Sequence, residues 1–465
     1  MTFTDLRFFA CLAPAVILFY CVPVRWRSAF LLILSYLFYF TWSVPYSLLL
    51  FVLTAVVYFA GIAADRASSD RQRKIAAMTA IILLVEILTG FKSLPHWRQT
   101  HSLAIPLGLS YYTFKLISYV LDVYWGKTPA EKNFTALALY ASFFPQIFSG
   151  PIQRAPDFLE QLKTRVASGL NVPLFDTGLG FVLLGLLEKL VIADRIAPFI
   201  ARVDGALELQ SSLAVLLSCY CYTVMLFADF SALTLIALGI GMLFGIQGPP
   251  NFNLPFAAAN IQEFWRRWHM SLTGWLGDYL FLPLRMALRK AGLWGLSLSI
   301  LINMVLIGLW HGFGSNYLAF GLLHGAFMVT SVLTANWRNA VFKGQKGWVA
   351  IRRLWGQLIT FHLVTLAFVF FRSSSIDSSI SILRKIAHAS AISAGVTTSG
   401  GDVFRAALAA SVIALILGYG LLSRNIEDFL TQAKGWPLYV VYGLALFVVV
   451  LLKVVDGGQF IYARF

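Results

Sequence analysis

Residues 46–64 read YSLLLFVLTAVVYFAGIAA, a run without a single charged side chain. A helix that crosses the roughly 30 Å hydrocarbon core of a bilayer needs about 20 mainly apolar residues, so this run has the length of one membrane span. The residues that follow, 65–74, read DRASSDRQRK. Because basic residues concentrate in cytoplasmic loops, we expect residues 46–64 to span a membrane and residues 65–74 to lie in the cytoplasm.

The composition of the whole chain agrees with a protein built largely from such spans. Of its 465 residues, 59% are hydrophobic and 12% are charged, whereas soluble domains have about 45–50% apolar and about 25% charged residues. A water-soluble globule could not bury that much apolar surface, and a disordered chain would be far more polar. The composition therefore predicts an all-α polytopic membrane protein.

The apolar runs predict about 11–14 helical segments, some of them re-entrant or lying at the membrane surface. Arg25 and Arg27 follow the first run, so they face the cytoplasm and the N-terminus lies outside. No internal repeat or soluble domain is visible, and we expect residues 1–465 to form one integral-membrane domain. The expected spans are 7–24, 28–44, 46–64, 75–91, 104–124, 134–150, 176–198, 210–230, 231–247, 293–311, 316–335, 355–372, 404–423 and 436–453.

Residues 248–290 differ from an ordinary loop, because they combine several Trp and Phe residues with embedded charges. Loops are usually small and polar. We expect this segment to form amphipathic helices that lie at or dip into the membrane face, with Trp and Arg side chains at headgroup depth.

The formal charge of +15 comes from 36 Lys and Arg against 21 Asp and Glu. The basic residues lie in short connectors rather than along one face or tail, which argues against nucleic-acid binding. Cys11, Cys21, Cys219 and Cys221 lie in apolar runs without zinc-ligand spacing, so we predict buried side chains and no metal site. Because no phosphate-binding glycine loop is present either, we predict no bound cofactor.

His311 is the first candidate for chemistry, since ionisable residues inside membrane spans are costly and often functional. It lies in GLWHGFG, at a break between two apolar runs, with Gly308 and Gly312 close by. A titratable imidazole at such a break can act as a general base. The alternative is a buried histidine that is hydrogen-bonded to a neighbouring carbonyl.

Four further residues lie near His311 or in the aromatic segment. His324 lies 13 residues after His311. It is expected to act as a hydrogen-bonding helper to His311 or, as the alternative, to be the second ligand of a bis-histidine haem. His269 lies in FWRRWH, in which Arg266 or Arg267 either grips a phosphate or carboxylate of a donor or anchors the segment at the interface.

Buried charges elsewhere have both structural and functional interpretations. Asp229 either pairs with a buried partner or orients an imidazole. Glu188 and Lys189 are expected to neutralise each other at a helix end. Lys115 and Asp122 are two turns apart on one helix face, which favours structural ion pairs to other helices.

Taken together, these segments resemble the membrane-bound O-acyltransferase family, in particular its bacterial branch of alginate O-acetylation and teichoic-acid D-alanylation proteins. One departure is Gly277, where the branch typically has an arginine before Asp-Tyr. The matching segments, in the order of the family, are PLGLSYYTFKLISYVLDVYWG (106–126), FFPQIFSGPIQR (143–154), LFADFSALTLIALGIG (226–241), NFNLPFAAANIQEFWRRWHMSLTGWLGDYLF (251–281) and GLWHGFGSNYLAFGLLHG (308–325).

The resemblance implies a ring of transmembrane helices around a central funnel, with the active histidine at its base. It matches His311 to the active histidine and His269 to the second motif position. Trp310 or Tyr317 is then a candidate donor for the developing oxyanion. The motif-bearing core covers about 90–330, and residues from about 350 to 465 are expected to be packing helices.

The sequence thus predicts an O-acyltransferase of the bacterial inner membrane. It moves an acyl group, acetyl in the first place, from a cytoplasmic thioester (acetyl-CoA or an acyl carrier protein) to hydroxyls of an envelope polysaccharide or to a periplasmic relay protein. By resemblance, a periplasmic transferase or a small membrane protein is the expected partner. The alternatives are D-alanyl transfer to a teichoic-acid-like polymer and, from another class, a transporter of lipid-linked glycans.

Overall fold

The computed structural model describes residues 3–98, 106–147, 150–341, 349–388, 429, 435–452 and 460. These described residues form helices and connecting loops with no β-strand among them, which confirms the all-α prediction. The expected span 404–423 lies outside the described residues.

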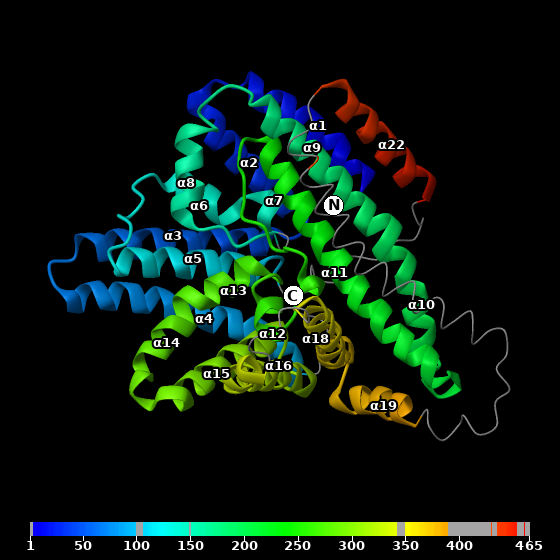
Figure 1. Cartoon of the computed structure of the whole chain (residues 1–465). Coiled ribbons are helices and arrows are strands. Elements are labelled where there is room, and N and C mark those ends of the chain that lie inside the picture. The colour runs from blue at the N-terminus through cyan, green and yellow to red at the C-terminus, as the bar shows by residue number, and fades with distance from the viewer. Residues whose placement is uncertain are drawn as a thin grey trace.

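The N-terminal part consists of helices that pack side by side. Helices α3, α4 and α5 form one layer, and α6 packs between α2 and α3 (Figure 1). The expected span 134–150 is not one helix, since its helical run ends at Ser142 and a short helix follows. The helices are α1 (Leu6–Cys21), α2 (Arg27–Phe40), α3 (Val44–Arg66), α4 (Asp70–Arg98), α5 (Leu109–Tyr124), α6 (Phe134–Ser142), α7 (Phe144–Ile147) and α8 (Ala155–Thr164), with a 3-10 turn at Val24–Trp26.

A long pair of helices crosses the middle of the molecule (Figure 1). Helix α9 (Val172–Leu187) continues through a π-helical segment (Glu188–Ala193) into α10 (Asp194–Gly205), and α11 (Ser212–Leu243) packs along this whole unit. The prediction of two spans at 210–230 and 231–247 is wrong, because α11 is one helix of 32 residues. Its most apolar window is 94% buried inside the protein, so protein rather than lipid covers it. A 3-10 turn at Leu207–Leu209 precedes it.

The third part holds the aromatic segment and the helices that follow it in the chain. The short helices expected in residues 248–290 are present, but Trp265, Trp268 and Trp275 are buried in the core and do not anchor the protein at the membrane surface. The helices are α12 (Ile261–Trp265), α13 (Met270–Leu276), a π-helical segment (Gly277–Phe281), α14 (Leu282–Ala287), α15 (Gly292–His311), α16 (Ser315–Leu333), α17 (Ala335–Val341), α18 (Val349–Arg372), α19 (Ile376–Ala387) and α22 (Trp436–Leu452), with 3-10 turns at Pro255–Ala257 and Arg289–Ala291.

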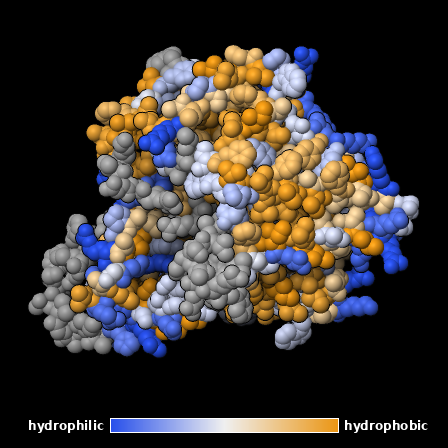
Figure 2. Space-filling view, turned by 180° about the vertical axis from the view of Figure 1, so that it is seen from behind, coloured by the Kyte–Doolittle hydropathy of each residue, from blue (hydrophilic) through white to orange (hydrophobic). Residues whose placement is uncertain are grey.

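The protein is embedded in a membrane by several spans. Within the described ranges, six helices are long and apolar enough to cross a bilayer, and broad hydrophobic areas cover the face seen in Figure 2. The remaining expected spans that are described correspond to shorter or interrupted helices. The six are Val44–Arg66, Asp70–Ser93, Ser212–Leu243, Arg289–His311, Ser315–Leu333 and Val349–Arg372.

One edge of the molecule gathers polar connectors. The α3–α4 turn and the α14–α15 turn lie on the same side in Figure 1, and hydrophilic side chains line the corresponding edge in Figure 2. Direct contacts tie this edge together: Arg73 donates to the Val123 carbonyl, the Tyr279 hydroxyl donates to Asp122, and Arg154 pairs with Asp278. The loop with the DRASSDRQRK sequence belongs to this edge, hereafter the basic edge.

Candidate active site

His311 is the last residue of α15, and α16 packs closely against it. A side chain at Gly308 would come within 2.3 Å of the Tyr317 carbonyl oxygen, so only glycine permits this approach of the two helices. The His311 side chain is buried, with its ring 4.6 Å from that of Trp310 and 4.8 Å from that of Phe371. The glycines beside His311 therefore bring a second helix against the imidazole.

His269 reaches the same place from the aromatic segment. It precedes α13 with φ 47° and ψ 50°, a left-handed conformation that is uncommon for a residue with a side chain. Such strain persists only where the surroundings hold it, and it is frequent at functional sites. The His269 ring is 1% exposed and lies 4.7 Å from Phe230 and 6.0 Å from Trp310.

A buried hydrogen-bond network holds the backbone next to His269. The Met270 N–H donates to the Asn251 carbonyl, and the Ser271 hydroxyl donates to the Asn251 side-chain oxygen. The Asn251 amide in turn donates to the Thr234 hydroxyl of α11. Because Asn251 is fully buried, this network fixes the strained residue against α11.

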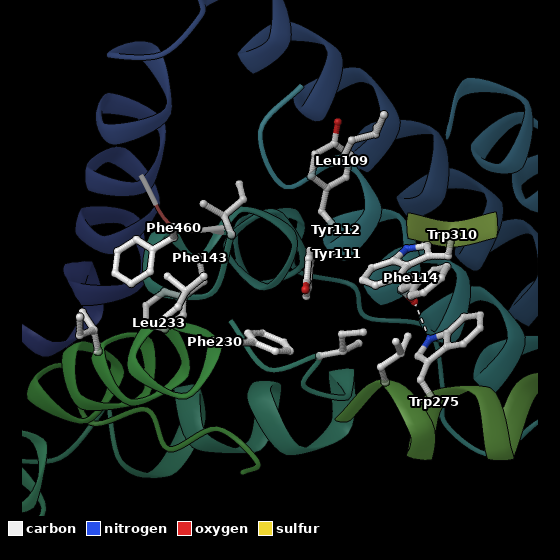
Figure 3. Close-up of a cluster of buried hydrophobic side chains, with 14 of the residues drawn as sticks. Leu109, Tyr111, Tyr112, Phe114, Phe143, Phe230, Leu233, Trp275, Trp310 and Phe460 are labelled. Carbon is white, nitrogen blue, oxygen red and sulfur yellow. Dashed lines mark hydrogen bonds between the residues drawn. The ribbon is translucent and has the colours of Figure 1, made fainter. Parts of the chain in front are cut away.

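Trp310 lies between the two histidines and makes them one site. Its ring also contacts Phe114 and Tyr111 of α5, and the Trp275 indole donates to the Phe114 carbonyl at 2.9 Å (Figure 3). Trp310 is 7% exposed, and its own indole N–H has no hydrogen-bond partner among the described residues. A buried donor left unpaired is costly, so one that persists beside two imidazoles points to a bound acceptor.

The structure gives His324 a different partner from the expected one. Its Nδ1 accepts a hydrogen bond from the Trp265 indole at 3.3 Å. The Phe320 ring contacts both His324 and His311, at 4.7 Å and 6.2 Å. His324 thus supports the aromatic packing around the site. Tyr317 packs its ring on Phe371, which itself contacts His311.

Asp229 pairs with a lysine. Its carboxylate accepts from Lys189 at 2.8 Å, and Lys189 also pairs with Asp194 at 2.9 Å. The expectation that Lys189 is neutralised by Glu188 is therefore corrected. Asp229 joins α11 to the π-helical segment, while the next residue, Phe230, reaches His269.

The two arginines of the aromatic segment differ in their surroundings. Arg267 binds Glu263 through two nitrogens and the Asn253 carbonyl through a third contact. Burial alone would raise the pKa of Glu263, but the Ala259 N–H, Arg267 and the charge of Arg353 lower it below its usual value. Arg267 is thus committed to a structural ion pair, whereas Arg266 is exposed and lines a groove.

The buried charges of α5 are only partly as expected. Lys115 donates to the Gln146 side chain and lies over the Tyr140 ring, with no ion pair within the described part of the chain. Asp122 does form an ion pair, with the exposed Lys127.

Sequence reasoning missed two residues of this site, Lys92 and Tyr111. Lys92, near the end of α4, is 9% exposed and donates to the Trp310 carbonyl. The sequence could have identified Lys92, because it is an isolated cation that directly follows an apolar run. Tyr111 stacks at 6.4 Å on His269, and no motif set it apart from the other aromatic residues of α5.

Comparison with known proteins identifies the family of the chain. Residues 129–371 match the model of the membrane-bound O-acyltransferase family. The chain is 33% identical to a probable alginate O-acetylase, AlgI, of Pseudomonas aeruginosa, over 77% of this chain and 69% of the relative. It is 30% identical to a peptidoglycan O-acetyltransferase of Helicobacter pylori (76% and 72%) and 32% identical to a teichoic acid D-alanyltransferase of Bacillus subtilis (60% and 71%). The chain therefore belongs to the membrane-bound O-acyltransferase family and is a multi-pass O-acyltransferase.

Proposed function

We propose that this enzyme transfers an acetyl group from a thioester on the cytoplasmic side of the bacterial inner membrane to hydroxyls of an envelope polysaccharide or to a periplasmic relay protein. The observation that carries the proposal is the unpaired Trp310 indole N–H, buried between His269 and His311. An imidazole can take the proton of the acceptor hydroxyl, and the indole N–H can bind the oxyanion that forms on the acyl carbon. The relatives named as O-acetylases or O-acetyltransferases support acetyl as the group.

A groove between the aromatic segment and helices α15 and α16 is the proposed path of the donor. It has a volume of about 540 Å³ and is lined by Arg266, Met270, Gly277 and Met304, among others. Met304 lies seven residues before His311, about 10 Å along the helix axis. Acetyl-CoA and acyl carrier proteins present the thioester on the same arm, which carries a phosphate and two amides.

The polar groups of the groove suit that arm. Arg266 is exposed and can bind the phosphate. Asn303 of α15 also lines the groove. It is 9% exposed, and its side-chain oxygen has no hydrogen-bond partner within the described ranges. It can accept a hydrogen bond from an amide N–H of the arm.

Filling the groove is expected to weaken donor binding. Gly274 lines the groove, and a Cβ at this position would have no other atom within 4 Å, so the Gly274→Leu side chain would extend into the groove. We expect the KM for the thioester donor to rise about tenfold or more, the cost of one or two lost or displaced contacts. Initial-rate kinetics with acetyl-CoA measure this rise.

Gly443→Leu is the matched control, because Gly443 also faces open space but lies on the exposed surface of α22. Its donor KM should stay that of the wild type. Equal donor KM values for Gly274→Leu and the wild type would show that the arm does not use this groove.

Removing the indole N–H is expected to slow the chemical step. Trp310→Phe keeps an aromatic ring between the histidines but has no donor. Loss of one oxyanion donor costs about 100-fold or more in kcat. We expect kcat to fall by that factor while the donor KM changes little, and an unchanged kcat would rule out the indole as the oxyanion donor.

The overall proposal is tested by the identity of the released group. Alkaline release from envelopes of cells with and without the enzyme, followed by mass spectrometry, should show loss of acetate. Loss of D-alanine in its place would establish the second candidate, which the similarity to a teichoic acid D-alanyltransferase favours. The proposed periplasmic or small membrane partner is checked by co-purification from the same cells.

A further inference from the structure

Lys92 is a buried cation at the candidate active site whose role the motifs do not assign. Its ammonium donates to the carbonyl oxygen of Trp310 and lies 5.0 Å from the centre of the Trp310 ring. The last carbonyls of a helix have no partner within that helix, and Trp310 is the penultimate residue of α15. Lys92 thus binds the turn that carries both Trp310 and His311.

The partners of Lys92 do not neutralise it. Within the described ranges, Lys92 forms no ion pair with a carboxylate. A backbone carbonyl and an aromatic face bind a cation less strongly than a carboxylate does, and burying an uncompensated charge is costly. A neutral donor could hold the helix end equally well, so the presence of a lysine at this position needs a further explanation.

The position of Lys92 beside Trp310 supplies an explanation for a lysine there. Trp310 is the residue that contacts both imidazoles, and Lys92 touches Trp310 at its carbonyl and at its ring. An ammonium has three N–H donors, and the interaction with the Trp310 carbonyl uses one of them. In a site with little water, a nearby cation stabilises developing negative charge far more than it does in water.

We propose that Lys92 is a positioning residue for acyl transfer, which holds the last turn of α15 and places a positive charge beside Trp310. This inference rests on the proposed thioester reaction. There the acceptor oxygen bonds to the acyl carbon while its proton moves to the imidazole of His311, and negative charge gathers on the acyl oxygen. Collapse then breaks the carbon–sulfur bond, and the departing sulfur takes the proton from the imidazolium.

The test compares Lys92→Met, which keeps the length but loses the charge and the donors, with Lys92→Arg, which keeps both. The full-length enzyme in detergent is assayed with acetyl-CoA and with envelope polysaccharide of the host that has been deacetylated by mild alkali. We expect kcat of Lys92→Met to fall about 100-fold, as for loss of an electrostatic stabiliser, with the acetyl-CoA KM nearly unchanged. The kcat of Lys92→Arg should be at least tenfold higher than that of Lys92→Met.

Lys115→Met is the matched control, because Lys115 is also a buried lysine with uncharged partners, Gln146 and Tyr140, and it contacts neither histidine. Its kcat should stay within threefold of the wild type. A Lys92→Met enzyme with normal kcat would overturn the proposal. The proposal would also be overturned if both Lys92 variants lost activity equally and in proportion to a loss of folded protein, because that result marks a merely structural role.

Failure of the donor assignment gives a different result. If the wild-type enzyme does not use acetyl-CoA, the proposed donor is wrong, and the same variants are then compared by the O-acyl content of the envelope in cells. A normal content in Lys92→Met cells overturns the role of Lys92 whatever the donor is.

Discussion

Replacing His311 by glutamine is expected to reduce acyl transfer by about 1,000-fold, the scale of losing a general base. Glutamine has a similar size and remains polar, so the packing with Trp310 and Phe371 stays largely filled. It cannot accept the hydroxyl proton at neutral pH. The O-acyl content of the envelope, measured by alkaline release and mass spectrometry at matched expression, should fall to the level of cells without the enzyme.

His362→Gln is the control for this experiment. His362 lies on α18, and its ring bonds the Tyr220 hydroxyl at 2.9 Å, away from the two site histidines. Envelope acylation should be normal in this variant. If His311→Gln cells also kept their acyl groups, His311 would be a packing residue, and a transporter that does no chemistry would explain the intramembrane charges better.

The sequence was sufficient to predict the fold class, and it singled out His311 as a candidate for a different reason. The fold class depends on composition and on the length of apolar runs, which each segment carries by itself. His311 stood out because an ionisable residue between glycines is rare in an apolar run. The structure brings His269 within 6.0 Å of Trp310, the residue next to His311.

Other features could not be predicted, because they depend on contacts between distant segments. The division of α11 into two spans assumed that each span crosses lipid at about 20 residues, but a helix of 32 residues that is covered by protein has no such limit. One partner of Lys189, Asp229 on α11, is 40 residues away in sequence. The neighbour of Lys92 is 218 residues away. Local patterns contain no information on such pairs.

The strongest effect on stability is expected at the buried ion triad of Lys189, Asp194 and Asp229. All three side chains are at most 5% exposed, and the lysine bridges the two carboxylates. Lys189→Met removes the lysine that both buried carboxylates bind, and breaking a buried ion pair typically costs about 3–5 kcal/mol. We expect a clear fall in the thermal unfolding temperature of the purified protein in detergent, and a low yield of folded protein.

Neutralising the carboxylates together with the lysine separates charge from packing. The triple variant Lys189→Met, Asp194→Asn, Asp229→Asn carries no unpaired charge in the triad and should recover most of the lost stability. If it unfolded as readily as Lys189→Met alone, the destabilisation would come from lost side-chain packing and not from buried charge.

Asp229→Asn then decides whether Asp229 takes part in catalysis. Its carboxylate binds Lys189, and the contact with His269 comes from the neighbouring Phe230. We therefore expect the single variant to lower stability while the activity per folded molecule stays within about fivefold of the wild type, since no oxyanion donor or base is removed. The fraction of folded protein, measured by gel filtration, corrects the activity for unfolding. A loss of 100-fold or more in that corrected activity would show that Asp229 acts on the histidines, against the geometry of the ion triad.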